Sequence, residues 1–162
     1  VLSPAWRASE RRWVTMESRT FYNEVLTEHN VRPAHKRALA GECFSLEGVN
    51  PSCGDELTLR VHLDGDTIAD MSYDGEGCSI SQASTSILGD LVIDQDIDHF
   101  SGLYDDFLEM MHSKGEITPD EDRFEDAIAF AGVSKFPARV KCALLAWSAL
   151  RDAVSKASAK EN

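Results

Sequence analysis

The sequence predicts an α+β fold, in which one N-terminal helix precedes a small three-stranded antiparallel sheet and a C-terminal helical layer packs against that sheet. Three observations support this prediction. Apolar residues recur at helical spacing in residues 19–30, they alternate with polar residues between positions 42 and 73, and helical spacing returns after residue 78. A chain of 162 residues without internal repeats has the size of one domain.

Turn residues bound the first helix and the strands. The apolar side chains of residues 19–30 fall on one helical face, and Pro33 prevents the helix from continuing. The tetrapeptide DGDT between Leu63 and Ile68 is typical of a β-hairpin turn. These signals predict that the strands are joined in the order in which they occur along the chain.

Four helical segments are expected after the sheet. The stretch SISQASTSILGDLVI opens with serines suited to an N-cap and continues as an amphipathic helix. Residues 96–115 place their apolar side chains on one face, and residues 136–157 repeat the same spacing. Between them, residues 118–132 are expected to form a helix capped by Thr118, with Pro119 at its first position.

The charge balance argues against nucleic-acid binding. The chain carries 28 acidic residues against 16 lysines and arginines, a formal net charge of −12. Affinity for DNA or RNA requires clustered cations on one face, and no basic stripe is present. No apolar run is long enough to span a bilayer, and the first 15 residues lack the apolar stretch of a secretory signal. We therefore expect a cytoplasmic protein that binds neither nucleic acid nor membrane.

The cysteines point toward metal or thiol chemistry. Four cysteines are too few and too dispersed for a disulfide framework. Cys53 lies in a turn before a strand, Cys78 precedes a helix and Cys142 lies inside the last helix, so with Asp55 they form a candidate set of four zinc ligands. Their spacing matches no compact zinc-finger pattern, so separate structural roles remain an alternative.

Glycines lie beside two of these cysteines. Gly54 separates Cys53 from Asp55 and allows a tight turn, and Gly75 and Gly77 precede Cys78. The positive end of the helix after Cys78 would favour its thiolate. Each glycine is equally compatible with an ordinary turn.

The remaining cysteine and the histidines suggest no second site. Cys43 has apolar, strand-like neighbours and is interpreted as a small core thiol. The five histidines are scattered, and the motif of zinc deaminases is missing, which disfavours that class. Nothing in the sequence supports a cysteine-protease dyad.

Three blocks of the chain resemble a known family. FYNEVLTEHNVRPAHKRAL, NPSCGDELTLRVHLDGDTIADMSYDGEGCSISQASTSIL and FPARVKCALLAW are similar, in this order, to the signature blocks of SufU-type proteins, which are relatives of the IscU iron-sulfur scaffold. The resemblance extends from about Met16 to the C-terminal helix. Residues 16–162 are accordingly expected to form the single domain, and residues 1–15 to be a cloning scar or a disordered extension.

The resemblance implies a site, a metal and an activity. Cys53, Asp55, Cys78 and Cys142 correspond to the zinc ligands of the family. The implied activity is that of a Zn²⁺-dependent sulfurtransferase, which accepts persulfide sulfur from a SufS-type cysteine desulfurase. The sulfur then passes to a downstream iron-sulfur assembly scaffold.

Two features favour the SufU branch over the IscU branch. IscU-type scaffolds carry a histidine directly before the third cysteine, where this chain has Lys141. The segment GEITPDEDRFEDAIAFAG resembles an insertion found in SufU-type proteins. Arg139 also matches an arginine of the SufU pattern, although a solvated helix arginine is an equally good interpretation.

Mobility predicts which cysteine receives the sulfur. Cys78 and Cys142 are tied to helices, whereas Cys53 lies in a turn between Pro51 and Gly54, so Cys53 is the expected acceptor. Two alternatives remain open at this point. The same residues could assemble a [2Fe-2S] cluster, or they could hold a zinc ion that is only structural.

Overall fold

The computed structural model describes residues 18–33, 35–39, 44–50 and 54–161. The described helices and 3₁₀ segments are, in chain order, α2 (Ser18–Val31), α3 (Ser79–Val92), α4 (Ile97–Met111), α5 (Glu121–Phe124), η2 (Glu125–Ala131), η3 (Val133–Lys135) and α6 (Pro137–Glu161). The strands are β1 (Phe44–Asn50), β2 (Asp55–Asp64) and β3 (Thr67–Glu76). The predicted α+β fold is confirmed, whereas the predictions for residues 1–15, Cys43 and Cys53 concern residues outside the described part.

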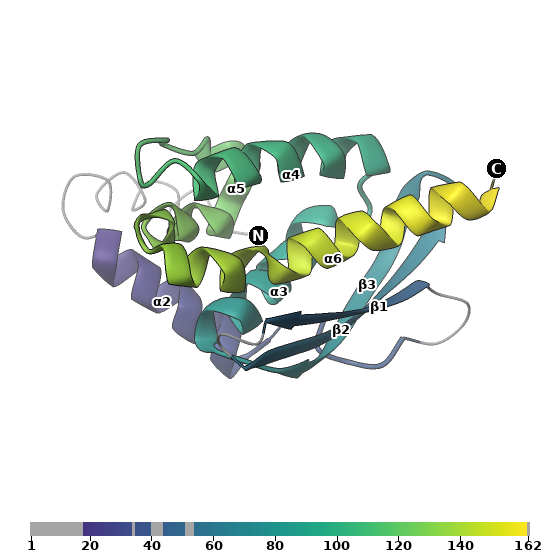
Figure 1. The fold of residues 1–162 in the computed structure, drawn as a ribbon, viewed down its shortest axis with the longest axis horizontal. Helices are drawn as coiled ribbons and strands as arrows, with labels where there is room; N and C mark the ends of the chain where they lie inside the picture. The colour runs from purple at the N-terminus through teal and green to yellow at the C-terminus, as the bar shows by residue number, and fades with distance from the viewer. Residues whose placement is uncertain (1–17, 34, 40–43, 51–53, 162) are drawn as a thin grey trace.

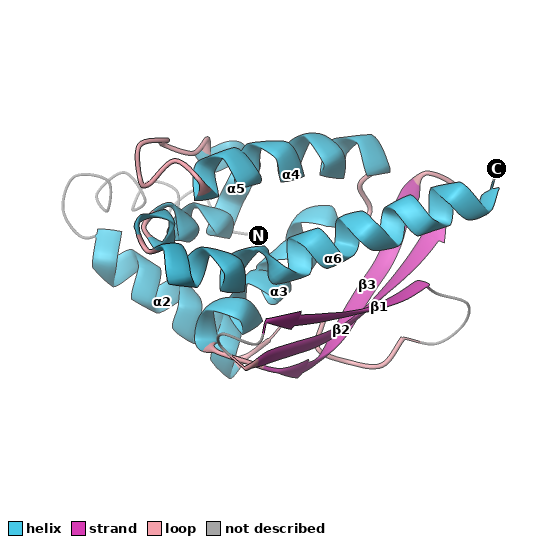
Figure 2. Ribbon diagram, in the orientation of Figure 1, coloured by secondary structure: helices cyan, strands magenta, loops and turns pink. Residues whose placement is uncertain are grey.

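The three strands form one antiparallel sheet in the order β1-β2-β3 (Figure 2). Asp64 pairs with Thr67, so the predicted hairpin turns through Gly65 and Asp66. Along β2 the side chains of Leu57, Leu59 and Val61 are buried while the intervening ones are more exposed. This alternation shows that one face of the sheet meets the core and the other faces solvent.

Helices α3 and α6 cover the buried face of the sheet (Figure 1). Helix α6 packs on β1 and β2, where a methyl group of Leu145 lies 3.0 Å from the position that a Cβ at Gly48 would occupy. Helix α3 packs on β3 and against α6, and α2 packs against α3. The N-terminal end of α3 therefore meets the first turns of α6 beside the sheet.

A second helical layer lies on the far side of α6. Trp147 of α6 stacks on Phe107 of α4, with ring centroids 3.9 Å apart and planes inclined by 4°. Phe130 of η2 meets the same Phe107 edge-on. Stacked and edge-on aromatic pairs bury large apolar areas, so this cluster fixes α6 between the sheet and α4.

The segment after α4 differs from the predicted helix. Thr118 and Pro119 precede any helix, and Asp120 is the residue that caps α5 by accepting a hydrogen bond from the Asp122 amide. Helix α5 ends after one turn at Glu125, whose φ of 46° is left-handed, and the chain continues as 3₁₀ helix. A left-handed residue cannot continue a right-handed helix, so the apolar spacing of residues 118–132 packs without forming one long α-helix.

The start of α3 also departs from the expected capping. Cys78 occupies the N-cap position, and none of the serines that follow it does. Among the helices of the described residues, none is long and apolar enough to cross a membrane.

Candidate metal centre

Asp55 opens strand β2 at the edge of the buried face. It pairs with Asn50 of β1, and its side chain is only 1% exposed. Because side chains alternate along a strand, Asp55 faces the helices together with Leu57, whereas Glu56 faces solvent. A carboxylate is thus held beneath the helical layer, where burial of a charge requires compensating partners.

Cys78 lies between the end of β3 and the start of α3. Its φ and ψ of −70° and 165° are extended, as expected for an N-cap residue, and its side chain is partly buried. The thiol therefore lies at the N-terminal end of a 14-residue helix.

Cys142 belongs to the second turn of α6 and is fully buried. A polar link joins its helix to the one that follows Cys78. Ser84 of α3 donates a hydrogen bond of 2.6 Å to the carbonyl of Ala143, and the Trp147 indole donates one of 3.1 Å to the Ser84 hydroxyl. The helices that carry the two cysteines are thereby bonded to each other one residue away from Cys142.

These three side chains converge. One carboxylate oxygen of Asp55 and the sulfurs of Cys78 and Cys142 all lie within 4.8 Å of one another. One ion placed among them can contact all three donors after small side-chain adjustments, and thiolates with a carboxylate are a donor set that zinc accepts. The structure thus brings together three of the four predicted ligands, and the fourth, Cys53, lies outside the described residues.

Hydrogen bonds fix the Asp55 carboxylate without any metal. Its Oδ1 accepts one bond of 2.8 Å from the Cys78 amide and one of 3.1 Å from the Ser81 hydroxyl. The sequence prediction did not include Ser81, which lies one helical turn after Cys78. Only that spacing, three residues beyond the N-cap, indicates that its side chain faces the same site.

The two glycines before Cys78 have different functions. Gly75 has a φ of 138°, and a Cβ there would overlap the carbonyl oxygen of Glu56 on the paired strand. Gly77 needs no special backbone angle. A Cβ at Gly77 would lie 2.5 Å from both Asp55 Oδ1 and Ser81 Oγ, so the absence of a side chain leaves room for the bond between them.

Arg139 and Lys141 lie near the start of α6. Both are exposed and flank Val140, immediately before Cys142. Both residues are close to Cys142 in the sequence, but their side chains lie on the solvent side of α6.

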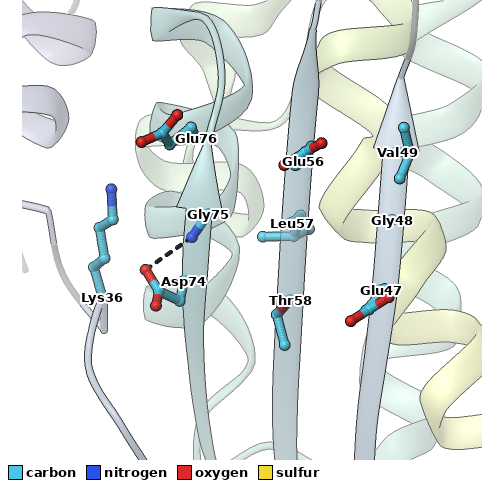
Figure 3. A pocket seen from close by; sticks show the side chains of 10 residues that line it. All are labelled: Lys36, Glu47, Gly48, Val49, Glu56, Leu57, Thr58, Asp74, Gly75 and Glu76. Carbon is cyan, nitrogen blue, oxygen red and sulfur yellow. Dashed lines mark hydrogen bonds between the residues drawn. The ribbon is translucent and has the colours of Figure 1, made fainter.

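An acidic groove of ≈ 580 Å³ runs over the solvent face of the sheet next to this site (Figure 3). Its carboxylates are Glu47, Glu56, Asp74 and Glu76, and Lys36 is the cation of its lining. Glu56 pairs directly with Glu76 across β2 and β3. None of the three candidate ligands lines the groove, because they lie on the opposite face of the sheet.

Residues 21–143 match the family model of the NifU-like N-terminal domain. The chain belongs to this family. The match contains all of the candidate ligands, from Cys53 to Cys142.

Named members of the NifU-like N-terminal domain family resemble the chain closely. It is 40% identical over 138 residues to the iron-sulfur cluster assembly scaffold protein IscU of Streptococcus pyogenes serotype M1, covering 85% of this chain and 84% of that protein. It is 39% identical over 137 residues to the zinc-dependent sulfurtransferase SufU of Bacillus subtilis strain 168, covering 85% and 91%. The recognised resemblance to SufU and IscU proteins is confirmed.

A solved structure supports the same fold. The putative iron-sulfur cluster assembly scaffold protein for the SUF system from Fervidobacterium islandicum AW-1 superposes with a TM-score of 0.75 at 33% identity, covering 83% of this chain and 97% of that one. The chain is therefore a NifU-like domain of the IscU/SufU type, and the family assembles iron-sulfur clusters.

Proposed function

We propose that the protein is a zinc-dependent sulfurtransferase that accepts persulfide sulfur from a SufS-type cysteine desulfurase and passes it to an iron-sulfur assembly scaffold. The observation that carries this proposal is the convergence of Asp55, Cys78 and Cys142 within 4.8 Å. The relative named as a zinc-dependent sulfurtransferase gives independent support, with 39% identity over most of both chains.

Cys53, Asp55, Cys78 and Cys142 are the residues that would hold zinc. Bound zinc keeps cysteine ligands as thiolates at neutral pH, which is the form that reacts with a persulfide. The four donors together carry more negative charge than one divalent ion neutralises. Arg139 and Lys141, which are both exposed, would offset part of that excess and orient the approaching persulfide.

Cys53 is the proposed sulfur acceptor. Its thiolate attacks the terminal sulfur of the protonated desulfurase persulfide, a new S–S bond forms at Cys53, and the desulfurase cysteine leaves as a thiolate. The transferred sulfur keeps its proton, so no external oxidant or reductant is needed. The contrast with the other two cysteines supports this choice, since Cys142 is fully buried and Cys78 is an N-cap, whereas Gly54 next to Cys53 is exposed.

Desulfurase turnover tests the proposal. The wild-type protein is added to a SufS-type desulfurase with cysteine as substrate, and alanine release and radioactive sulfur on the acceptor are measured. We expect Cys53→Ala to abolish both the stimulation and the labelling. Cys43→Ala is the matched control, because Cys43 is not a candidate ligand. Full stimulation by Cys53→Ala would refute the acceptor assignment, and no stimulation by the wild type would indicate a zinc ion that is only structural.

The alternative function is that of a scaffold on which a [2Fe-2S] cluster is assembled. The names of two relatives favour it, since one is a scaffold protein IscU and the other a putative SUF-system scaffold. Elemental analysis of protein purified without added metal separates the two functions. About one tightly held zinc per chain and a colourless protein after incubation with iron and sulfide support the transferase. A stable coloured protein that transfers its cluster to an apo-acceptor supports the scaffold.

A further inference from the structure

Ser81 contacts the candidate metal centre without offering a ligand to it. Its side chain is 4% exposed, and its hydroxyl lies 3.1 Å from Asp55 Oδ1 and 3.1 Å from the carbonyl oxygen of Cys78. A hydroxyl has one proton, so these two acceptors compete for it. A carboxylate is the stronger acceptor because charge-assisted hydrogen bonds are shorter and stronger than neutral ones. The proton of Ser81 is therefore directed to Asp55.

Two neighbouring groups help to keep the Asp55 carboxylate in this position. The Cys78 amide donates to the same Oδ1 at 2.8 Å. Gly77 has a hydrogen where another residue would have a Cβ beside Asp55 Oδ1 and the Ser81 hydroxyl, so no side chain at this position separates the two atoms. These two groups and the Ser81 hydroxyl all come from residues 77–81, around the start of α3. The same segment that carries the Cys78 sulfur thus also fixes the orientation of Asp55.

We propose that Ser81 is a positioning residue for the metal centre, whose hydroxyl holds the Asp55 carboxylate in the ligating orientation. The proposal rests on the proposed zinc site. Hydrogen bonds from residues behind a metal ligand orient it and tune its basicity, and their loss typically weakens metal binding by roughly 10-fold to 100-fold.

This assignment changes the expected order of ligand release. A carboxylate in a site of thiolates is the harder donor and, by metal chemistry alone, the one zinc holds least. The protein counteracts that preference, since Asp55 begins a paired strand and is held by two hydrogen bonds that do not need the metal. Asp55 is then retained by its attachment to the protein rather than by its affinity for zinc.

Cobalt binding to Ser81→Ala tests the proposal. Co²⁺ is titrated into the metal-free full chain, and its affinity and dissociation rate to a chelator are measured together with its absorption spectrum. Sulfur-to-cobalt charge-transfer intensity reports the thiolates, and the ligand-field bands report the whole donor set. Ser86→Ala is the matched control, because Ser86 is a buried serine of the same helix whose hydroxyl bonds His29. Ser81→Thr keeps the hydroxyl.

We expect Ser81→Ala to weaken cobalt binding by roughly 10-fold to 100-fold and to alter the ligand-field bands at unchanged charge-transfer intensity. Ser86→Ala should leave the cobalt affinity, the ligand-field bands and the charge-transfer intensity unchanged. Ser81→Thr should retain most of the affinity. Wild-type affinity and bands in Ser81→Ala would overturn the proposal. So would a loss of charge-transfer intensity, because it would mean that the variant disturbs the cysteines rather than Asp55. Failure of the wild type to bind cobalt at all would instead refute the proposed metal site.

Discussion

Helix α3 takes part in two buried polar clusters that have similar components and different properties. In the first, Ser81 bonds Asp55, and the sulfurs of Cys78 and Cys142 lie beside them. In the second, His29 of α2 bonds Ser86 at 2.7 Å through Nδ1 and Asp126 of η2 at 3.0 Å through Nε2. Both clusters join a serine of α3 to a carboxylate from a distant part of the chain.

The clusters differ in what remains to bind a ligand. Hydrogen bonds link Ser86, His29 and Asp126 in the arrangement of a hydrolase triad, and both ring nitrogens of His29 are used in these bonds. Because Ser86 is fully buried, a substrate has no access to its hydroxyl. The first cluster instead collects donors that a single cation can share. The first cluster is thus a candidate binding site because its donors face a common point, whereas the second joins α2, α3 and η2 through hydrogen bonds.

Removing a sulfur ligand should give the largest contrast between the clusters. We expect Cys142→Ala to weaken zinc binding by more than the ~100-fold that loss of a hydrogen bond behind a ligand causes, because a direct donor is lost. His29→Ala serves as the control and should bind zinc as the wild type does. Competition with a chromophoric chelator measures both affinities. Tight zinc binding by Cys142→Ala would remove Cys142 from the ligand set.

The second cluster should affect folding rather than metal. His29→Ala leaves the buried Ser86 hydroxyl and the Asp126 carboxylate without their imidazole partner, which costs about 1–3 kcal/mol of unfolding free energy. Urea unfolding of the metal-free protein measures this change, and Glu24→Ala, an exposed residue of the same helix, is the control. A zinc affinity that falls in parallel would contradict the separation of the two clusters.

A smaller effect is expected at Gly77. The added Cβ of Gly77→Ala would meet the flexible ends of Asp55 and Ser81, which can rotate away from each other, so the fold should persist while their bond is lost. We expect zinc affinity to fall by about 10-fold, near the lower limit for such contacts. Gly65→Ala, where a Cβ meets open space but the φ is 61°, controls for the cost of a side chain in a turn. Equal affinities in the two variants would contradict the proposed use of Gly77.

The smallest effect concerns an exposed ion pair outside both clusters. Burial opposes ionisation of Asp70, but the Arg37 guanidinium at 2.7 Å and the Met71 amide outweigh it and hold the pKa of this carboxyl below its ordinary value. A lowered pKa adds stability above the unfolded value of about 3.9, and this stability disappears as the pH falls through the folded pKa. Since the pair is partly exposed, Arg37→Ala should cost at most about 1 kcal/mol at neutral pH and nothing near pH 2.

Unfolding measured across this pH range checks the Asp70 prediction. Lys36→Ala, the neighbouring exposed cation, is the control, since it makes no contact with Asp70 among the interactions of the described residues. An effect of Arg37→Ala that is equal at both ends of the range would show that the charge on Asp70 is not its source.

The sheet was predictable from the sequence, whereas the residue that caps α5 and the secondary structure of residues 118–132 were not. Period-two alternation and the DGDT turn identify β2 and β3 because both signals are local. The capping prediction at Thr118 was wrong because Asp120 offers a carboxylate two residues later, and Glu125 turns the chain out of the helix. Competing caps and left-handed residues are weak signals in a single sequence.

The sequence predicted the candidate ligands of the site, which are the cysteines and Asp55, but not the residues that hold them in place. Resemblance to SufU-type proteins supplied the set, and spacing alone left it open. Ser81 is one of five serine or threonine residues between positions 79 and 86, and only the fold distinguishes the one that faces Asp55. The partners of His29 lie 57 and 97 residues away, so their contact with His29 depends on tertiary packing.

The Ser84 link between α3 and α6 has a consequence for metal binding and release. The Ser84 hydroxyl bonds the Ala143 carbonyl and the Trp147 indole, so the backbone segments that carry Cys78 and Cys142 are held in fixed relative positions without a bound ion. Uptake at these two donors then needs only rotations of their side chains. The domain should consequently load and unload its ion while remaining folded, unlike the small zinc modules that unfold when they are stripped.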